Sequence, residues 1–226
     1  TYIFNLGQNI AGWVRLKVHG PAGTRVVLRF AERLNPDNPI YRSNLRSARA
    51  TDTCVLRGGE EEWEPRFTYH GFQYVEVTGY PGPPELEAIT GIVVHSAAPR
   101  AGWFECSARM VNKLYENIVW TQRANFIDIP TDCPQRDERL GWLGDAHVFA
   151  RTAAYNMDLA SLLGKWLVDV ADAQSHEGAY PEVAPRWPGT GGGTPGWADA
   201  GIICPWIVYQ VYGDRGIMDN HYKRMK

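Results

Sequence analysis

The densest group of residues able to do acid–base chemistry lies at positions 132–145. The segment reads Asp-Cys-Pro-Gln-Arg-Asp-Glu-Arg-Leu-Gly-Trp-Leu-Gly-Asp and holds four carboxylates, two arginines and a tryptophan. Carboxylates are costly to remove from water unless they are paired or hydrogen-bonded, so this density beside apolar residues needs a cause. Two interpretations are open: a structural ion-pair network, or a site that binds hydroxyl groups and transfers protons.

The second interpretation fits glycoside hydrolysis. That reaction needs one protonated carboxylic acid to donate to the leaving oxygen and a second carboxylate on the opposite face of the sugar. Neighbouring carboxylates favour this division, because like charges resist joint ionisation. The remaining acids can accept hydrogen bonds from sugar hydroxyls, and Trp142 offers a face for stacking. The structural alternative stays open for single residues, with Asp132 as a helix cap and Asp137 or Glu138 as first-turn acids paired with an arginine.

A helix must position the end of this acidic segment. We predict that it runs from about Arg139 to Tyr155. Residues three and four apart share a helix face, so Trp142, Asp145 and Phe149 would lie on one side. Glu138 would then lie one turn above them.

The chain has two halves with different hydrophobic periods. Over residues 1–98 apolar side chains recur at every second position, which predicts an antiparallel β-sandwich. Residues 13–18 and 26–30 show this alternation on either side of a Gly-Pro turn and predict a hairpin. Further strands are expected at Thr51–Leu56, Glu62–Phe67, Phe72–Thr78 and Leu86–His95.

Beyond Pro99 the period becomes helical. Ser107 is the expected N-cap of a first helix that carries Met110, Val111 and Leu114 at helical spacing. Further helices are expected at 158–172, at 197–212 with Pro205 inside, and from 215 onward.

The segment 176–196 is long and rich in proline and glycine. Such a loop is more often functional than idle, although a disordered surface excursion is the alternative. We predict domains at 1–98 and 99–226, and we expect the helical domain to continue beyond the residues given.

Composition narrows the function classes. A chain of 226 residues with 44% hydrophobic and 21% charged residues is typical of a globular protein. Its net charge of −2 and the lack of a basic run argue against nucleic acid. No membrane span or targeting segment is evident, and the sequence favours neither a cytoplasmic nor a secreted location. The four cysteines are widely spaced, which argues against a zinc site and predicts mostly buried free thiols. Nine tryptophans fit either an aromatic core or sugar stacking.

The acidic segment closely resembles the signature of the bacterial α-L-rhamnosidases of glycoside hydrolase family 78. Further motifs fit the same family, at residues 4–13, 69–76, 125–131, 196–200 and 212–214. The resemblance implies a β-sandwich followed by an (α/α)6 barrel, of which this chain holds the first helices. It also implies an inverting enzyme that needs no cofactor and releases terminal α-L-rhamnose from a glycoside or polysaccharide.

The resemblance assigns roles to single residues. Glu138 falls on the general acid of the family motif. The positions expected to bind the sugar are Asp132, Arg136, Trp142, Asp145 and Trp197. The general base of the family is a glutamate late in the barrel, beyond Lys226, so this chain alone is expected to be inactive. Its exposed barrel faces could form an oligomer interface. The alternatives are another inverting α/α-barrel glycosidase and a non-catalytic carbohydrate-binding fragment.

Overall fold

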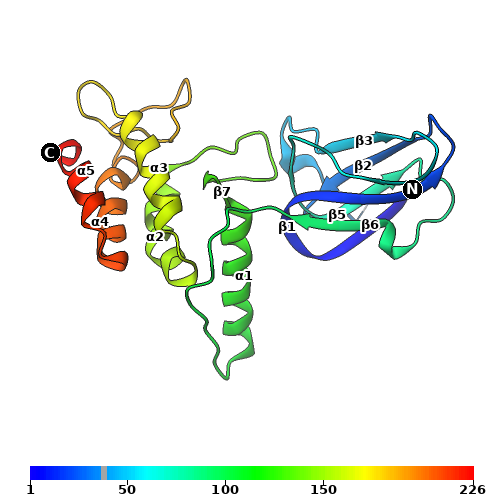
Figure 1. Cartoon of the computed structure of the whole chain (residues 1–226), viewed down its shortest axis with the longest axis horizontal. Helices are drawn as coiled ribbons and strands as arrows, with labels where there is room; N and C mark the ends of the chain where they lie inside the picture. The colour runs from blue at the N-terminus through cyan, green and yellow to red at the C-terminus, as the bar shows by residue number, and fades with distance from the viewer. Residues whose placement is uncertain (37–39) are drawn as a thin grey trace. The chain divides into compact units, whose positions relative to one another are not determined.

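The computed structural model describes residues 1–36 and 40–226, which form two compact units. The sandwich unit comprises Thr1–His95 together with Cys133–Arg139. The helical unit comprises Ser96–Asp132 and Leu140–Lys226. Figure 1 shows the strands of the first in blue to green and the helices of the second in green to red.

The sandwich unit is a curled antiparallel sheet. Its strands are β1 (Tyr2–Gly20), β2 (Arg25–Ala31), β3 (Thr51–Val55), β4 (Gly59–Trp63), β5 (His70–Thr78) and β6 (Ile89–Val93). The sheet order is β3-β2-β5-β1-β4, and β6 also pairs with β1. Every second residue is buried over positions 12–20 of β1 and 26–30 of β2, which is the alternation that the sequence predicts.

Strand β1 changes partners at Gly12. This residue pairs with His70 of β5 and with Val93 of β6, and the strand then continues along β6 and β4. A Cβ atom on Gly12 would lie 1.8 Å from the carbonyl oxygen of Ile92. Only glycine therefore allows the two backbones to approach this closely where β1 passes from one partner strand to the other.

The predicted hairpin between the first two strands is wrong. Strand β5 lies between β1 and β2 and pairs with both. The turn that follows β1 bonds to the end of β3 instead, since Gly23 N–H donates to Leu56 O and Leu56 N–H to Thr24 O. A period of two identifies a strand and its buried face but does not identify its neighbour.

The helical unit contains five α-helices and a short two-stranded ribbon. Helices α2, α3 and α4 share an apolar core in which Trp166 is fully buried and donates from Nε1 to Ala184 O at 3.0 Å. Within the described residues, no helix has both the length and the apolar character of a membrane span. The elements are α1 (Arg109–Asn125), β7 (Phe126–Ile127), β8 (Ile129–Pro130), α2 (Leu143–Asn156), α3 (Ala160–Asp172), α4 (Ala200–Tyr212) and α5 (Arg215–Met225).

Two helix starts differ from the prediction. Helix α1 has Ala108 rather than Ser107 at its N-cap position. Helix α2 begins at Leu143 rather than Arg139, because Arg139 has a left-handed φ of 59° that a continuing helix cannot contain. The start of α5 agrees with the prediction, and there Asp214 caps the helix by accepting from Gly216 and Ile217 N–H.

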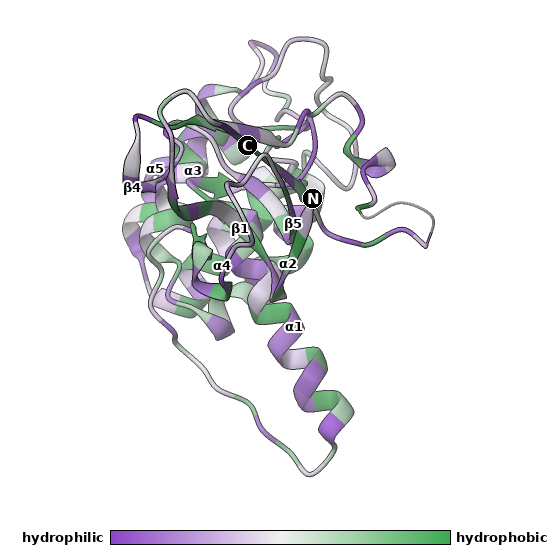
Figure 2. Cartoon of the chain, turned by 90° about the vertical axis from the view of Figure 1, so that its right-hand side faces the viewer, coloured by the Kyte–Doolittle hydropathy of each residue, from purple (hydrophilic) through white to green (hydrophobic). Residues whose placement is uncertain are grey.

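The apolar residues that predict α1 lie exposed. Met110 is 84% exposed, and Val111 and Leu114 are also on the surface. The helix is anchored instead by its C-terminal half, where Val119 and Gln122 are buried. Figure 2 shows apolar green and polar purple residues side by side along α1.

The long loop before α4 is packed rather than disordered. Val183 and Ala184 are fully buried within it, and Pro181 forms a bridge with Gly192. Residues 180–184 of the loop therefore belong to the core of the helical unit, whereas residues 185–193 lie mostly on its surface. All four cysteines are free thiols, as predicted, and two of them are buried, Cys54 and Cys204.

Candidate active site

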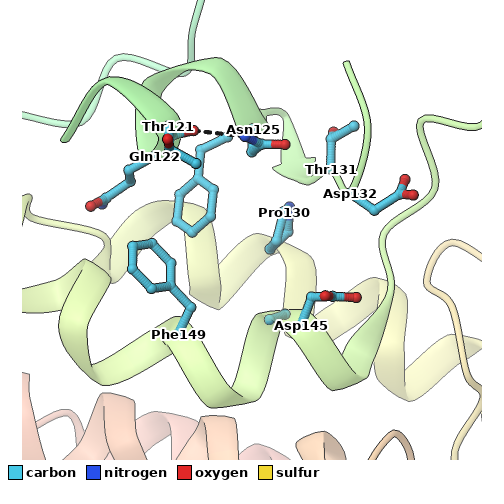
Figure 3. A pocket seen from close by; sticks show the side chains of 10 residues that line it. Thr121, Gln122, Asn125, Pro130, Thr131, Asp132, Asp145 and Phe149 are labelled. Atoms are coloured by element: carbon cyan, nitrogen blue, oxygen red, sulfur yellow. Dashed lines mark hydrogen bonds between the residues drawn. The ribbon is translucent and has the colours of Figure 1, made fainter. Parts of the chain in front are cut away.

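Asp132 and Asp145 line one hollow of the helical unit. Its volume is about 270 Å³, and it is bordered by the end of α1, by β7 and β8, and by the first turns of α2. Figure 3 shows the two carboxylates toward one end of this hollow and Phe149 toward the other. Of the three residues predicted to share a helix face, Asp145 and Phe149 do so, whereas Trp142 lies at the N-cap position before α2 and does not line the hollow.

Asp145 occupies the first turn of α2, where the partial positive charge of the helix start favours a carboxylate. Its side chain is exposed. Within the part of the chain that the structure describes, this carboxylate has no hydrogen-bond or ion-pair partner. It is therefore available to accept hydrogen bonds from hydroxyl groups.

Asp132 closes the acidic loop rather than capping a helix. Its Oδ1 accepts a hydrogen bond from Leu140 N–H at 2.8 Å, and its own N–H donates to Leu140 O at 3.0 Å. The cap position of α2 belongs to Trp142, and no side chain among the described residues caps this helix. The helix-cap alternative for Asp132 is wrong, and the residue instead fixes the neck of the loop 133–139 while lining the hollow.

Two indole rings flank the start of α2. Trp142 is its N-cap residue and forms a backbone bridge with Val183 of the long loop. Trp197 packs against Gly144, where an added Cβ atom would lie 3.0 Å from the indole Nε1. Both predicted aromatic residues therefore lie beside the helix turn that carries Asp145.

Glu138 and Arg136 form an ion pair at the tip of the acidic loop. Arg136 Nη2 lies 2.7 Å from Glu138 Oε2, and Arg46 Nη1 lies 3.1 Å from the same oxygen. The Glu138 side chain is 17% exposed. The expectation that Glu138 lies on the helix one turn above Trp142 is wrong, since residues 138–142 precede α2.

A segment between β2 and β3 holds the loop tip. Arg46, with a left-handed φ of 55°, supplies the second cation on Glu138. Ser47 donates to Asp137 from its backbone N–H at 3.2 Å and from its hydroxyl. The hydrogen bond from the Ser47 hydroxyl is the main cause that lowers the pKa of Asp137 below its ordinary value.

The start of β5 holds the loop from another direction. Arg139 Nη2 donates to Tyr69 O at 2.6 Å, and its guanidinium lies 4.0 Å from the centre of the Tyr69 ring. Gly71 lies so close to Gln135 that an added Cβ atom would be 2.7 Å from the Gln135 Cβ. The loop 133–139 is thus fixed by contacts within the sandwich unit.

Glu138 also lines a second hollow, within the sandwich unit. This hollow has a volume of about 390 Å³, and Asp52 lies at its wall with its Oδ2 3.0 Å from His70 Nε2. The lining residues are Ala48, Arg49, Ala50, Thr51, Asp52, Thr68, His70, Gln135, Arg136, Asp137, Glu138 and Arg139.

The structure therefore brings the predicted site residues together in two groups. One group surrounds the start of α2, with Asp132, Asp145 and the two tryptophans. The other is the Arg136–Glu138 pair of the loop. The sequence did not lead us to expect Arg46, Ser47 and Arg49 at this site. Three arginines within positions 42–49, in a segment that has no strand or helix pattern, are the feature of the sequence that could have indicated them.

The chain thus joins an antiparallel β-sandwich to a unit of helices, with a carboxylate-rich loop before α2. Residues 99–226 match the bacterial α-L-rhamnosidase six-hairpin glycosidase domain. Residues 1–95 match the bacterial α-L-rhamnosidase concanavalin-like domain. The chain belongs to the bacterial α-L-rhamnosidase family, and the resemblance seen in the motifs is confirmed.

Individual relatives agree with this assignment. An α-L-rhamnosidase of Streptomyces avermitilis is 57% identical over 219 residues, which are 96% of this chain and 21% of the relative. An α-L-rhamnosidase of Formosa agariphila is 43% identical over 227 residues, covering 99% of this chain and 24% of the relative. The chain thus spans about a fifth to a quarter of the length of these proteins.

Solved structures confirm the fold class. The crystal structure of the Streptomyces avermitilis α-L-rhamnosidase complexed with L-rhamnose matches 98% of this chain with a TM-score of 0.96 and 56% identity, over 22% of its own length. The α-L-rhamnosidase of Aspergillus terreus matches 98% with a TM-score of 0.94 and 45% identity, over 26% of its length.

Proposed function

We propose that a protein of family length containing these residues is an inverting α-L-rhamnosidase that releases terminal rhamnose from glycosides or polysaccharides. Support comes from the family membership and from the similarity to a relative whose structure was determined with L-rhamnose. The observation that carries the proposal is Glu138, a mostly buried carboxyl group held by two guanidinium groups at the wall of a hollow.

Glu138 is the proposed general acid. A general acid must be held at the glycosidic oxygen, and the contacts with Arg46 and Arg136 fix the direction of its carboxyl group. When the proton passes to the leaving oxygen, negative charge develops on Glu138. The two guanidinium groups stabilise that charge because they are already in place before the reaction.

The group around the start of α2 is the proposed rhamnose pocket. Asp132 and Asp145 line its hollow and can accept hydrogen bonds from sugar hydroxyls. Rhamnose has a methyl group where most hexoses have a hydroxymethyl group, so its pocket needs an apolar wall. We propose that Trp142 and Trp197, which lie beside the first turn of α2 but are not among the residues that line the hollow, supply such a wall.

The general base is assigned to no residue of this chain. An inverting glycosidase needs it on the face of the sugar opposite the acid, where it activates a water molecule. We propose that it comes from a part of the barrel that these residues do not include. In the same proposal, residues 1–98 are the β-sandwich domain and residues 99–226 the N-terminal portion of the catalytic domain. The 226 residues by themselves should then give no turnover.

The test is hydrolysis of p-nitrophenyl α-L-rhamnoside and of a natural rhamnoside by the family-length protein, wild type against Glu138→Gln. We expect the variant to lose about 10²–10⁴-fold in kcat on the natural substrate, and less on the aryl substrate, whose leaving group needs little protonation. Glu76→Gln is the matched control, because Glu76 also pairs with an arginine, Arg29 at 2.8 Å, away from both hollows.

Two results would contradict the proposal. Equal rates for wild type and Glu138→Gln on the natural rhamnoside would remove Glu138 from the acid role. A wild-type protein that cleaves other p-nitrophenyl glycosides but no rhamnoside would establish a different sugar specificity.

A further inference from the structure

The hollow that Glu138 shares with the strands of the sandwich unit is large enough for a ligand. Its volume of about 390 Å³ falls within the roughly 300–1,000 Å³ usual for small-molecule sites. Its walls come from the segment after Ala48, from the start of β5 and from the tip of the acidic loop. The residues proposed to hold rhamnose, Asp132 and Asp145, line the other hollow.

The chemistry proposed for Glu138 indicates what this second hollow would hold. A general acid donates its proton to the oxygen that joins rhamnose to the leaving group. The first atoms of the leaving group are bonded to that oxygen, so they lie within reach of the acid. A hollow lined by Glu138 is therefore in position to receive the leaving group.

The charges of this hollow are balanced only while Glu138 is ionised. Three arginines and three carboxylates line it, and a protonated Glu138 leaves the three arginines facing two carboxylates, Asp52 and Asp137. Both of these already have partners, His70 for Asp52 and Ser47 for Asp137. With Glu138 protonated as the acid, positive charge therefore exceeds negative charge at this wall, and Arg46, which contacts Glu138 from outside the lining, adds to the excess.

Arg49 carries the available positive charge. Arg136 Nη2 is held 2.7 Å from the Glu138 carboxyl group, and Arg139 is held by the Tyr69 carbonyl and ring, so neither is free to turn toward a ligand. Among the residues that the structure describes, the Arg49 guanidinium has no partner, and its side chain is exposed to the hollow. The backbone carbonyl of Arg49 accepts hydrogen bonds from Arg42 and Thr51.

We propose that this hollow is the leaving-group subsite and that it favours an acidic sugar, a hexuronic acid, whose carboxylate binds Arg49. A guanidinium binds a carboxylate through two parallel hydrogen bonds, which suits a fixed pyranose carboxylate better than a neutral hydroxymethyl group. The inference rests on the proposed function, since it assumes that Glu138 protonates the leaving group.

The experiment uses rhamnosyl disaccharides of one linkage that differ only in the leaving sugar: glucuronic acid, its methyl ester, or glucose. Release of rhamnose by the family-length protein gives kcat/KM for each, with p-nitrophenyl α-L-rhamnoside as a reference. We expect the wild type to prefer glucuronic acid over both neutral sugars by about tenfold or more. Arg49→Gln should abolish that preference, and Arg49→Lys should restore part of it.

Arg57→Gln is the matched control. Arg57 is also an exposed arginine of the sandwich unit, it pairs with Glu61 at 3.0 Å, and it lies outside the hollow. This variant should keep the wild-type ratio of the kcat/KM values. Added salt should reduce the preference of the wild type, because Arg49 is exposed.

The possible results distinguish a failure of the acidic-subsite proposal from a failure of the proposed rhamnosidase function. A wild type that cleaves p-nitrophenyl α-L-rhamnoside and all three disaccharides at similar kcat/KM would overturn the acidic subsite and leave the function standing. A preference for glucuronic acid that survives Arg49→Gln would also overturn it. A wild type inactive on every rhamnoside would overturn the function and the subsite together.

Discussion

Replacing Gly71 by alanine would move the acidic loop without changing any charge. Gly71 lies near the start of β5 and pairs with Ala11 of β1. An added Cβ atom would lie 2.7 Å from Gln135 Cβ and 2.9 Å from Gln135 Cα. Carbon atoms pack best at about 3.5–4.0 Å, so Gln135 must retreat by about 1 Å. A residue in a strand cannot yield as easily as a loop, so the loop should be what moves.

The displacement should reach the proposed acid. Gln135 is three residues before Glu138 in the same tight loop. A misplacement of about 1 Å at a reacting group can cost about 10²-fold in rate. We therefore expect Gly71→Ala to lower kcat on a natural rhamnoside by about 10²-fold. If the loop instead resisted, the overpacking would appear as a loss of about 1–3 kcal/mol in the free energy of unfolding.

The assay combines rates with denaturant unfolding of the family-length protein. Gly164→Ala is the matched control, because its added Cβ atom meets nothing within 4 Å. Gly164 lies inside α3, where alanine should raise the free energy of unfolding by about 0.5–1 kcal/mol. Wild-type kcat together with wild-type stability in Gly71→Ala would refute the reasoning, because no relaxation would then have been needed.

Two further predictions concern hydrogen bonds. Gln122 is buried, donates to Ala153 O at 3.0 Å and accepts from Asn156 Nδ2 at 3.0 Å. In Gln122→Leu, Ala153 O keeps the Met157 N–H, but the buried Asn156 amide loses its partner, so the free energy of unfolding in urea should fall by about 1–3 kcal/mol. An unchanged midpoint would exclude this role. Ser47→Ala removes the hydroxyl hydrogen bond that lowers the pKa of Asp137. A carboxyl group whose pKa is lower in the folded protein than in the unfolded chain stabilises the fold at pH values above the unfolded-state pKa. That stabilisation is lost as the pH falls through the folded-state pKa. The melting temperature of this variant should therefore lie below that of the wild type at neutral pH, with a gap that closes below about pH 4, whereas a gap independent of pH would contradict this cause.

Local periodicity predicted most elements of this fold but not their neighbours, and it misplaced β4, which spans Gly59–Trp63 rather than Glu62–Phe67. The alternation in β1 and β2 reports which side chains are buried, and both strands form. Their pairing depends on β5, which is more than forty residues later in the chain. In the same way, Met110 and Leu114 correctly indicate a helix, yet they are exposed in it. A helical pattern predicts a face that can be buried and does not say what covers it.

The candidate site shows the same difference between what a local pattern predicts and what depends on distant contacts. Asp145 was placed correctly because its neighbours along one helix face determine where it points. Glu138 was placed on a helix that does not include it. Leu140 is tied to Asp132, and Arg139 turns away in a left-handed conformation to reach Tyr69. These contacts outweigh helix propensity, which amounts to only about 0.7 kcal/mol or less per ordinary residue.

The position of the acid therefore depends on residues that no local pattern connects to it. Arg46 is 92 positions from Glu138, and Ser47 is 90 from Asp137. The loop they hold contains no regular element that could keep its shape alone. It follows that the β-sandwich has a direct part in the proposed chemistry, because it supplies the cation that faces the acid and the backbone that fixes it. A helical domain separated from this sandwich would keep Asp132 and Asp145 but would lose the groups that orient Glu138.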